Sequence, residues 1–399
     1  MRWWALAVVL SRLYAAMALL ALILGAEAVT GSLADGALLV GLASGGFALA
    51  APWRGRRLDR GDLRRGLRRD SLWAAVAMFA LFWALVAAAP FWLLVILSVL
   101  IGAIPSGVEG GIRTLLPAVA PGNRLAQANA MEATLGELTF LLGPALAALI
   151  AMTLGPTAIM ASMAVASAAC GLVTLRLPDR VEEDAGPARD GERSDPAGGL
   201  SSALIGVWRF GRARPVFALA IAVGATFGLY ETALPGQLVS VGQPAASAGW
   251  VLTLAFAMSA GAGLVVSLAS PDDADRARAL AVPQACALLL VLGLGCVASA
   301  AGPTPLLWLA AMAIGATLAP LYAMGSLSLQ VTIPPARQSE GFAMFIAAQE
   351  IGSAIGNLLT SFLLERIGAA TLFVIAGTVV WICAALLLSH LVRRHSDRT

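Results

Sequence analysis

Residues 53–70 read WRGRRLDRGDLRRGLRRD, and eight of these eighteen residues are arginine. The rest of the 399-residue chain is poor in charge, since only 12% of all residues are charged and 59% are hydrophobic. Soluble domains have about 25% charged and roughly 45–50% apolar residues, so we expect lipid to surround much of this chain. A basic run can be a nucleic-acid patch or a loop held on one side of a membrane. Apolar sequence follows closely on both sides, which favours the loop and predicts no nucleic-acid partner.

Twelve segments are long and apolar enough to cross a bilayer, which takes about 20 residues. The sequence therefore predicts an all-α membrane protein that passes many times through the cell inner (cytoplasmic) membrane. The expected spans are 4–26, 34–52, 71–89, 91–112, 128–153, 156–176, 215–235, 247–269, 279–300, 304–327, 341–364 and 368–391.

The distribution of arginine supports this count. If the N-terminus is cytoplasmic, 24 of the 26 arginines fall at or beyond the cytoplasmic ends of the expected helices. The two others are Arg12, within the first span, and Arg366, in an outer loop. Positive charge concentrates in cytoplasmic loops, so we expect both termini to be cytoplasmic and residues 53–70 to form a cytoplasmic loop between the second and third helices.

The chain also divides into two similar halves. An offset of 213 residues matches Glu137 with Glu350, Gly143 with Gly356, and Gly155 with Gly368, which indicates an internal repeat of six helices. The longest polar stretch lies between the copies and is rich in Pro, Gly and charge, as flexible linkers are. The expected parts are an N-terminal six-helix bundle at 1–176, a cytoplasmic linker at 177–214, a C-terminal six-helix bundle at 215–392 and a cytoplasmic tail at 393–399.

Two short motifs give this plan a family resemblance. The arginine-rich stretch resembles the GxxxDRxGRR signature of the major facilitator superfamily, although Asp62 and Leu63 replace its second glycine and surroundings. The expected fifth helix contains Gly143 and Pro144, which resemble the end of that family's antiporter motif. With twelve helices in a parallel repeat, the chain resembles proton-coupled efflux permeases of this family. The family's arginine in the fourth helix is absent.

The resemblance implies a gating latch in the arginine-rich stretch. Glycine there would permit a tight reversal, and an aspartate would bridge to the start of the eleventh helix when the cytoplasmic side is shut. A contact that forms in one state biases the equilibrium between states. The alternative is that these arginines only fix the topology and touch anionic lipid. The latch residues are Gly55, Asp59, Arg60 and Arg64.

Ionisable groups inside a membrane are costly and mark functional sites. Glu137 lies about ten residues into its helix, which at about 1.5 Å per residue is close to mid-bilayer, and the repeat gives Glu350 the same depth. We expect both to carry protons or, alternatively, to be structural glutamates bonded to a neighbouring helix. The candidate proton-coupling or cavity residues are Glu137, Glu350, Arg12, Glu109, Glu231, Tyr14 and Tyr230.

The deep cation Arg12 needs a carboxylate, and Glu109, Glu137 or Glu350 could supply it; the alternative is that Arg12 snorkels to the inner surface. Glu109 and Arg113 are spaced to pair with each other on one helix. We expect Glu231 near the outer end of the seventh helix. Glu132, about one turn into the fifth helix, is assigned to the interface.

These observations predict a secondary active transporter that works by alternating access. We expect proton-coupled export of a small hydrophobic or amphipathic compound, by a monomer in the lipid bilayer. One alternative is transport of a polar solute such as a sugar or an amino acid, and another is a non-transporting receptor or scaffold. Cysteine and histidine have no metal-site spacing, and no catalytic motif is present. We therefore expect no enzyme activity, no metal and no cofactor.

Overall fold

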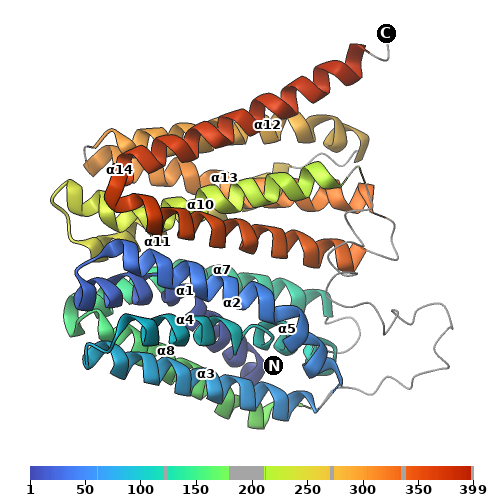
Figure 1. The fold of residues 1–399 in the computed structure, drawn as a ribbon. Coiled ribbons are helices and arrows are strands. Elements are labelled where there is room, and N and C mark those ends of the chain that lie inside the picture. Colours follow the sequence, from blue (N-terminus) through green and yellow to red (C-terminus); the bar gives the residue numbers. More distant parts are fainter. Residues whose placement is uncertain are drawn as a thin grey trace.

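The computed structural model describes residues 1–60, 62–120, 125–178, 211, 213–269, 274–302, 304–333 and 338–396. The side chains of some helical residues, including Asp59 and Arg60, lie outside this description. The described part of the chain is helical (Figure 1). The elements before the expected linker are α1 (Arg2–Thr30), α2 (Leu33–Arg60), α3 (Leu63–Val86), α4 (Phe91–Ala103), α5 (Val108–Arg113), α6 (Leu116–Val119), α7 (Leu125–Leu154), α8 (Thr157–Val173) and η2 (Thr174–Arg176).

The elements after the linker lie on the other side of the molecule in Figure 1, above α1–α8. They are α10 (Arg214–Ser240), η3 (Ala245–Ser247), α11 (Ala248–Ala269), α12 (Ala274–Ala300), α13 (Thr304–Thr332) and α14 (Gln338–Ser396).

Eleven stretches of the described chain are long and apolar enough to cross a membrane. The last of them, Met344–Ser389, contains 46 residues and holds two of the expected spans. Gly368 interrupts the helical backbone of α14 with φ 76° and ψ 159°, and Figure 1 shows α14 turning back there. This is a multi-pass membrane protein, and each expected span has a helical counterpart.

Two expectations about the helices were wrong in detail. Residues 53–70 are mostly helix and not a loop, because α2 continues to Arg60 and α3 starts at Leu63. Arginine favours helix, and the Asp62 carboxylate caps α3 by accepting a hydrogen bond from the Arg65 backbone N–H at 3.0 Å. The fourth span is broken between α4 and α5, where Pro105 lacks the N–H that a continuous helix needs.

Matched glycines of the repeat have matching local roles. Gly155 and Gly368 both have positive φ, 94° and 76°, at the turns that follow α7 and the first arm of α14. Gly143 packs on Ala16 of α1, and Gly356 packs on the backbone of α10 at Ala225 and Leu229. The offset found in the sequence thus joins positions that make the same turn or the same helix contact.

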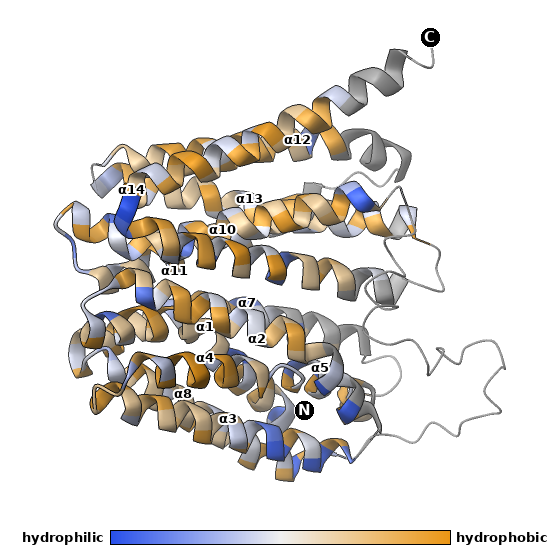
Figure 2. Ribbon diagram, in the orientation of Figure 1, coloured by the Kyte–Doolittle hydropathy of each residue, from blue (hydrophilic) through white to orange (hydrophobic). Residues whose placement is uncertain are grey.

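The two ends of the molecule differ in polarity. Figure 2 shows hydrophilic residues gathered at the right-hand ends of α3 and α5, on otherwise hydrophobic helices. We call this end, which carries residues 54–69, the arginine-rich end. The opposite end is formed by short turns at Gly31, Ala88, Gly155, Gly242, Gly302 and Gly368.

The apolar core is shared at the opposite end and divided at the arginine-rich end. The largest cluster takes residues from both sides, such as Leu20 and Met78 from the first half and Leu234 and Phe373 from the second. A second cluster, which includes Trp4, comes from the first half alone. A third cluster comes only from the region 213–348. The two halves are therefore joined by apolar packing mainly at the end with the short turns.

Candidate functional site

The candidate site begins with an ion pair between α1 and α7. Arg12 Nη2 lies 2.8 Å from Glu132 Oε1, and Arg12 Nη1 donates a hydrogen bond to the Glu132 carbonyl oxygen at 3.1 Å. The two side chains are only 16% and 5% exposed. Gly136, one turn beyond Glu132, leaves room for the guanidinium, because any side chain there would overlap it. Charge-assisted, bidentate contacts of this kind are strong where water is scarce.

Two further charges complete a network across three helices. Glu109 Oε2 of α5 lies 3.8 Å from Arg12 Nε, and Arg113 Nε lies 3.4 Å from Glu132 Oε2. Arg113 therefore pairs with Glu132 on another helix, and the expected pair of Glu109 with Arg113 was wrong. The reason is that Glu132 is buried, so its desolvated carboxylate draws both guanidinium groups. The network contains two cations and two anions.

The expected partners of Arg12 included Glu109 but not Glu132. Glu132 had been assigned to the membrane interface from its place near the start of its helix. Its pairing joins residues 120 positions apart, and no spacing in the sequence gives such a contact. The signal that could have found it is charge balance, since a buried guanidinium needs a carboxylate with an equally buried side chain.

A second group of carboxylates lies where the two halves face each other. Glu350 of α14 is near enough to Glu109 of α5 and to Glu231 of α10 to act electrostatically on both. All three side chains are half-buried. Glu231 lies deeper than expected, because α10 continues to Ser240, which puts about 13 Å of helix beyond Glu231. Among the described residues, no cation forms an ion pair with Glu231 or Glu350.

Glu137 lies apart from the Arg12 network. Its side chain is exposed. About three turns further along α7, on the same face, Ala148 packs beneath Gly249 of α11. Phe140 lies near that face and approaches Phe256 of α11, with ring centroids 6.4 Å apart. Glu137 is thus on the face of α7 that runs along the second half.

The two candidate tyrosines are packed in apolar surroundings. Tyr14 belongs to the shared core. Tyr230 is fully buried, and its ring lies 5.0 Å from the ring of Phe373, between centroids. The antiporter-like pair lies at a helix junction, where Gly143 contacts Ala16 of α1 and the Pro144 carbonyl faces Gly249 of α11.

The latch residues are only partly described. Gly55 lies inside α2 with open space around its Cα, so it makes no reversal. Arg64 Nη2 donates a hydrogen bond to the Leu175 carbonyl oxygen at 2.9 Å, within the first half. The side chains of Asp59 and Arg60 lie outside the described residues, and the latch stays a prediction.

Asp70 is a buried carboxylate that sequence reasoning missed. It is 1% exposed and lies 3.1 Å from Arg54 Nη1 and 3.0 Å from Arg69 Nη2. An acid placed between an arginine run and an apolar span was the available signal. In the part of the chain that the structure describes, His, Cys, Asp and Glu form no group of three that could hold a metal ion.

Known structures share this fold over nearly the whole chain. The nucleoside transporter NupG covers 98% of this chain and 99% of its own, with a TM-score of 0.76 and 14% identity. The human organic anion transporter MFSD10 covers 97% of this chain and 98% of its own, with a TM-score of 0.63 and 18% identity. A POT family transporter in complex with a thioalcohol-conjugated peptide covers 98% of this chain and 96% of its own, with a TM-score of 0.74 and 12% identity.

No curated protein sequence matches the chain. The sequence profile of the Major Facilitator Superfamily, however, matches residues 4–300, which is most of its length. This match agrees with the shared fold and with the helical spans. The chain belongs to the major facilitator superfamily, whose members are membrane transporters of small molecules and not enzymes.

Proposed function

We propose that the chain alternates access between two six-helix bundles, 1–176 and 215–392, joined by the linker 177–214. The observation that carries this proposal is the divided core, shared at one end and separate at the other. Transporters of this kind rock one repeat against the other around a fixed site. Arginine asymmetry supports a cytoplasmic position for the arginine-rich end, the linker and both termini, with the chain in the inner membrane.

The present conformation is closed at the opposite end. Ser32 Oγ, next to the first turn, donates a hydrogen bond to Glu365 Oε1 of α14. A side chain at Gly41 would overlap Leu358 of α14, so α2 and α14 are in close contact as well. Hydrogen bonds between the two halves are found, among the described residues, only at Ser32. Substrate would therefore enter this conformation from the cytoplasmic side.

Coupling to protons rests on the carboxylates Glu109, Glu231 and Glu350. Acidic residues inside membrane spans act as proton relays in pumps and transporters. Glu350 lies within electrostatic range of the other two, and these come from opposite bundles. When the bundles rock, the distance between Glu109 of the first bundle and Glu350 of the second changes, so a proton on Glu350 has different energies in the two conformations. Glu137, on the face of α7 toward the second bundle, is the next candidate carrier.

The substrate we propose is a small amphipathic or hydrophobic compound, which is exported. Five glutamates, at positions 109, 132, 137, 231 and 350, lie in the membrane-spanning part with two cations, Arg12 and Arg113, so carboxylates are in excess. Such an interior favours neutral or cationic compounds over anions. The antiporter-like Gly143 and Pro144 at the junction of α1, α7 and α11 support exchange of protons for the compound.

A polar solute is the second candidate. Glu350, Ser353 and Asn357 recur about one turn apart on α14 and give this helix a polar stripe. The solved structures with this fold include nucleoside and peptide-binding transporters. At such low identity they support the fold alone, so compounds of both classes belong in the screen.

The test is flux in proteoliposomes that contain a pH-sensitive dye. Compounds of both classes are screened with wild type, Glu350→Gln, Glu137→Gln and, as a matched control, Glu27→Gln near the end of α1. We expect a compound that moves protons with wild type and with Glu27→Gln, but binds Glu350→Gln without moving protons. Equal proton movement by Glu350→Gln would show that Glu350 is no relay. If the chain is a receptor or scaffold, none of the compounds will cause proton movement.

A further inference from the structure

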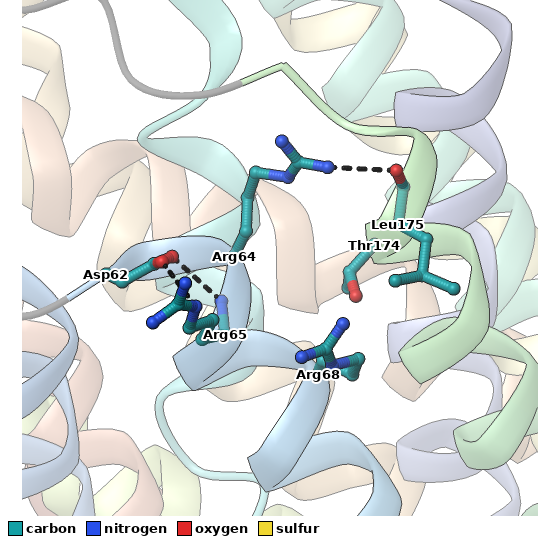
Figure 3. A pocket seen from close by; sticks show the side chains of 6 residues that line it. All are labelled: Asp62, Arg64, Arg65, Arg68, Thr174 and Leu175. Carbon is teal, nitrogen blue, oxygen red and sulfur yellow. Dashed lines mark hydrogen bonds and ion pairs between the residues drawn. The ribbon is translucent and has the colours of Figure 1, made fainter.

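Two adjoining hollows lie at the arginine-rich end, outside the proposed transport site. Their volumes are about 440 Å³ and about 400 Å³. Figure 3 shows the first, between the start of α3 and η2, with the arginines of α3 projecting around it. The first hollow is lined by Asp62, Arg64, Arg65, Arg68, Thr174 and Leu175. The second adds Arg57, Gly66 and Arg69.

The hollows are strongly positive, with five arginines and one aspartate in their lining. The single acid is already engaged, because Asp62 Oδ2 lies 3.1 Å from Arg65 Nε and Asp62 Oδ1 caps α3. Arg68 forms no ion pair or hydrogen bond in the part of the chain that the structure describes. Asp70, outside the lining, pairs with Arg69. Five arginines therefore face two aspartates among the described residues, and an anion would be attracted.

An apolar face begins directly beside these charges. One face of α3 continues from Arg65 through exposed side chains at helical spacing. These exposed residues are Leu72, Val76, Phe79 and Trp83. Leu172 of α8 is also exposed, and its neighbour Gly171 packs on Leu72. A charged end followed by a long exposed apolar face is the polarity profile of a phospholipid.

We propose that the arginine hollows bind the headgroup of an anionic phospholipid, whose phosphate lies against Arg65 and Arg68. The acyl chains lie along the exposed face of α3 and beside Leu172. Free phosphate offers the same anionic chemistry, but it would leave the adjoining apolar face unused. Guanidinium groups match phosphate oxygens with paired hydrogen bonds, and basic pockets at the cytoplasmic side of helix bundles suit lipid headgroups. This site does not depend on which solute is transported.

The test measures lipid retention by the full-length protein with native mass spectrometry. Delipidated protein receives equal amounts of phosphatidylglycerol and phosphatidylcholine. Wild type is compared with the double variant Arg65→Gln/Arg68→Gln and with the control Arg2→Gln/Arg366→Gln, which removes two arginines outside the hollows. We expect wild type and control to retain at least about fivefold more phosphatidylglycerol than the double variant, since a neutral amide binds phosphate more weakly than a guanidinium does. Retention of phosphatidylcholine should be equal in all three.

A second variant separates binding from folding. Leu175→Glu keeps every arginine and places a carboxylate at the exposed rim of the first hollow, so it should also lose phosphatidylglycerol, with an unchanged melting temperature in phosphatidylcholine. A competition experiment adds millimolar inorganic phosphate or glycerol phosphate to the lipid-bound protein. If either anion removes phosphatidylglycerol completely, the site binds free anions and the lipid assignment is wrong. The proposed site is wrong if the double variant retains as much phosphatidylglycerol as wild type does, or if the control loses as much phosphatidylglycerol as the double variant does.

Discussion

Arg54 of α2 and Asp70 of α3 form an ion pair, 3.1 Å between Nη1 and Oδ1, in which Asp70 is 1% exposed. Both residues belong to the arginine-rich stretch, yet this pair points inward. Leu58, one turn after Arg54, is buried as well, against Gly66 of α3 and Gly107 before α5. The stretch therefore has two faces, one that ties α2, α3 and α5 together and one that presents positive charge.

Removing the buried acid should destabilise the first half. Asp70→Ala leaves Arg54 without its carboxylate in a site that is mostly closed to water, and breaking one partner of a buried pair costs about 3 kcal/mol. Thermal unfolding in detergent measures the loss. Asp62→Ala is the control, because the Asp62 side chain is 48% exposed, and losing its exposed ion pair together with its cap on α3 should cost only about 1 kcal/mol. Similar losses in the two variants would refute the structural role of Asp70.

The Arg12–Glu132 pair predicts a rescue. Glu132→Ala leaves the Arg12 guanidinium with the backbone carbonyl of residue 132 and with Glu109, 3.8 Å away, as its one carboxylate among the described residues, and should lower stability by about 3 kcal/mol. The double variant Arg12→Met/Glu132→Leu removes both charges and should recover most of that loss, since apolar replacements of buried pairs are often neutral. Unfolding is followed by tryptophan fluorescence. No recovery in the double variant would mean that the pair is not the source of the loss.

The helical spans could be predicted because each needs only a run of apolar residues, which is local information. Gly155 and Gly368 could be matched for the same reason, since a glycine that permits positive φ is fixed by its own backbone. The extent of α2 was missed because polarity was taken to end the helix, whereas arginine continues it at little cost. Polarity marks where lipid ends and not where helix ends.

Close helix packing gives a prediction with a built-in control. A methyl group at Gly356 would overlap the backbone of α10 at Ala225, whereas one at Gly45 of α2 would meet open space. Gly356→Ala should therefore force α14 away from α10 and cost about 1–3 kcal/mol. Gly45→Ala should be neutral or stabilising by up to about 1 kcal/mol, because alanine favours helix. The measurement is thermal unfolding in the same detergent, and an equal cost at both positions would contradict the packing.

The turn glycines should respond alike in the two halves. Gly155→Ala and Gly368→Ala each place a side chain at a positive φ, 94° and 76°, which costs roughly 1 kcal/mol or more. Gly55→Ala, inside α2, is the control and should not destabilise. Unfolding midpoints of the three variants decide the matter. A loss at one turn and none at the other would show that the matched positions are not equivalent.

A disulfide between cysteines introduced in place of Ser32 and Glu365 should stop transport. The two side chains are hydrogen-bonded at the opposite end, and this end must open for alternating access. In a background without Cys170, Cys286, Cys296 and Cys383, the variant Ser32→Cys/Glu365→Cys is oxidised in proteoliposomes. We expect flux to be abolished on oxidation and restored by reductant, with either single variant unaffected. Flux through the cross-linked protein would argue that this end does not open.

The candidate site was harder to foresee than the fold. Glu109, Glu231 and Glu350 stood out because any carboxylate in an apolar span is conspicuous, and that argument needs only the sequence. Their proximity needs three helices from different parts of the chain to be placed together. Glu132 was assigned to the interface because it lies about one turn into its helix, and Asp70 was overlooked because it adjoins the arginine run, where an acid is ordinary. Only packing buries the two.

The shared core at the opposite end has a thermal consequence. To face the other way, the protein must part apolar side chains such as Leu20 and Leu234 while it brings others together at the arginine-rich end. Exposing these apolar side chains to water raises the heat capacity of the protein in its transition state. The turnover rate should then give a curved Eyring plot and respond little to ionic strength, as expected for a barrier made of hydration and not of charge.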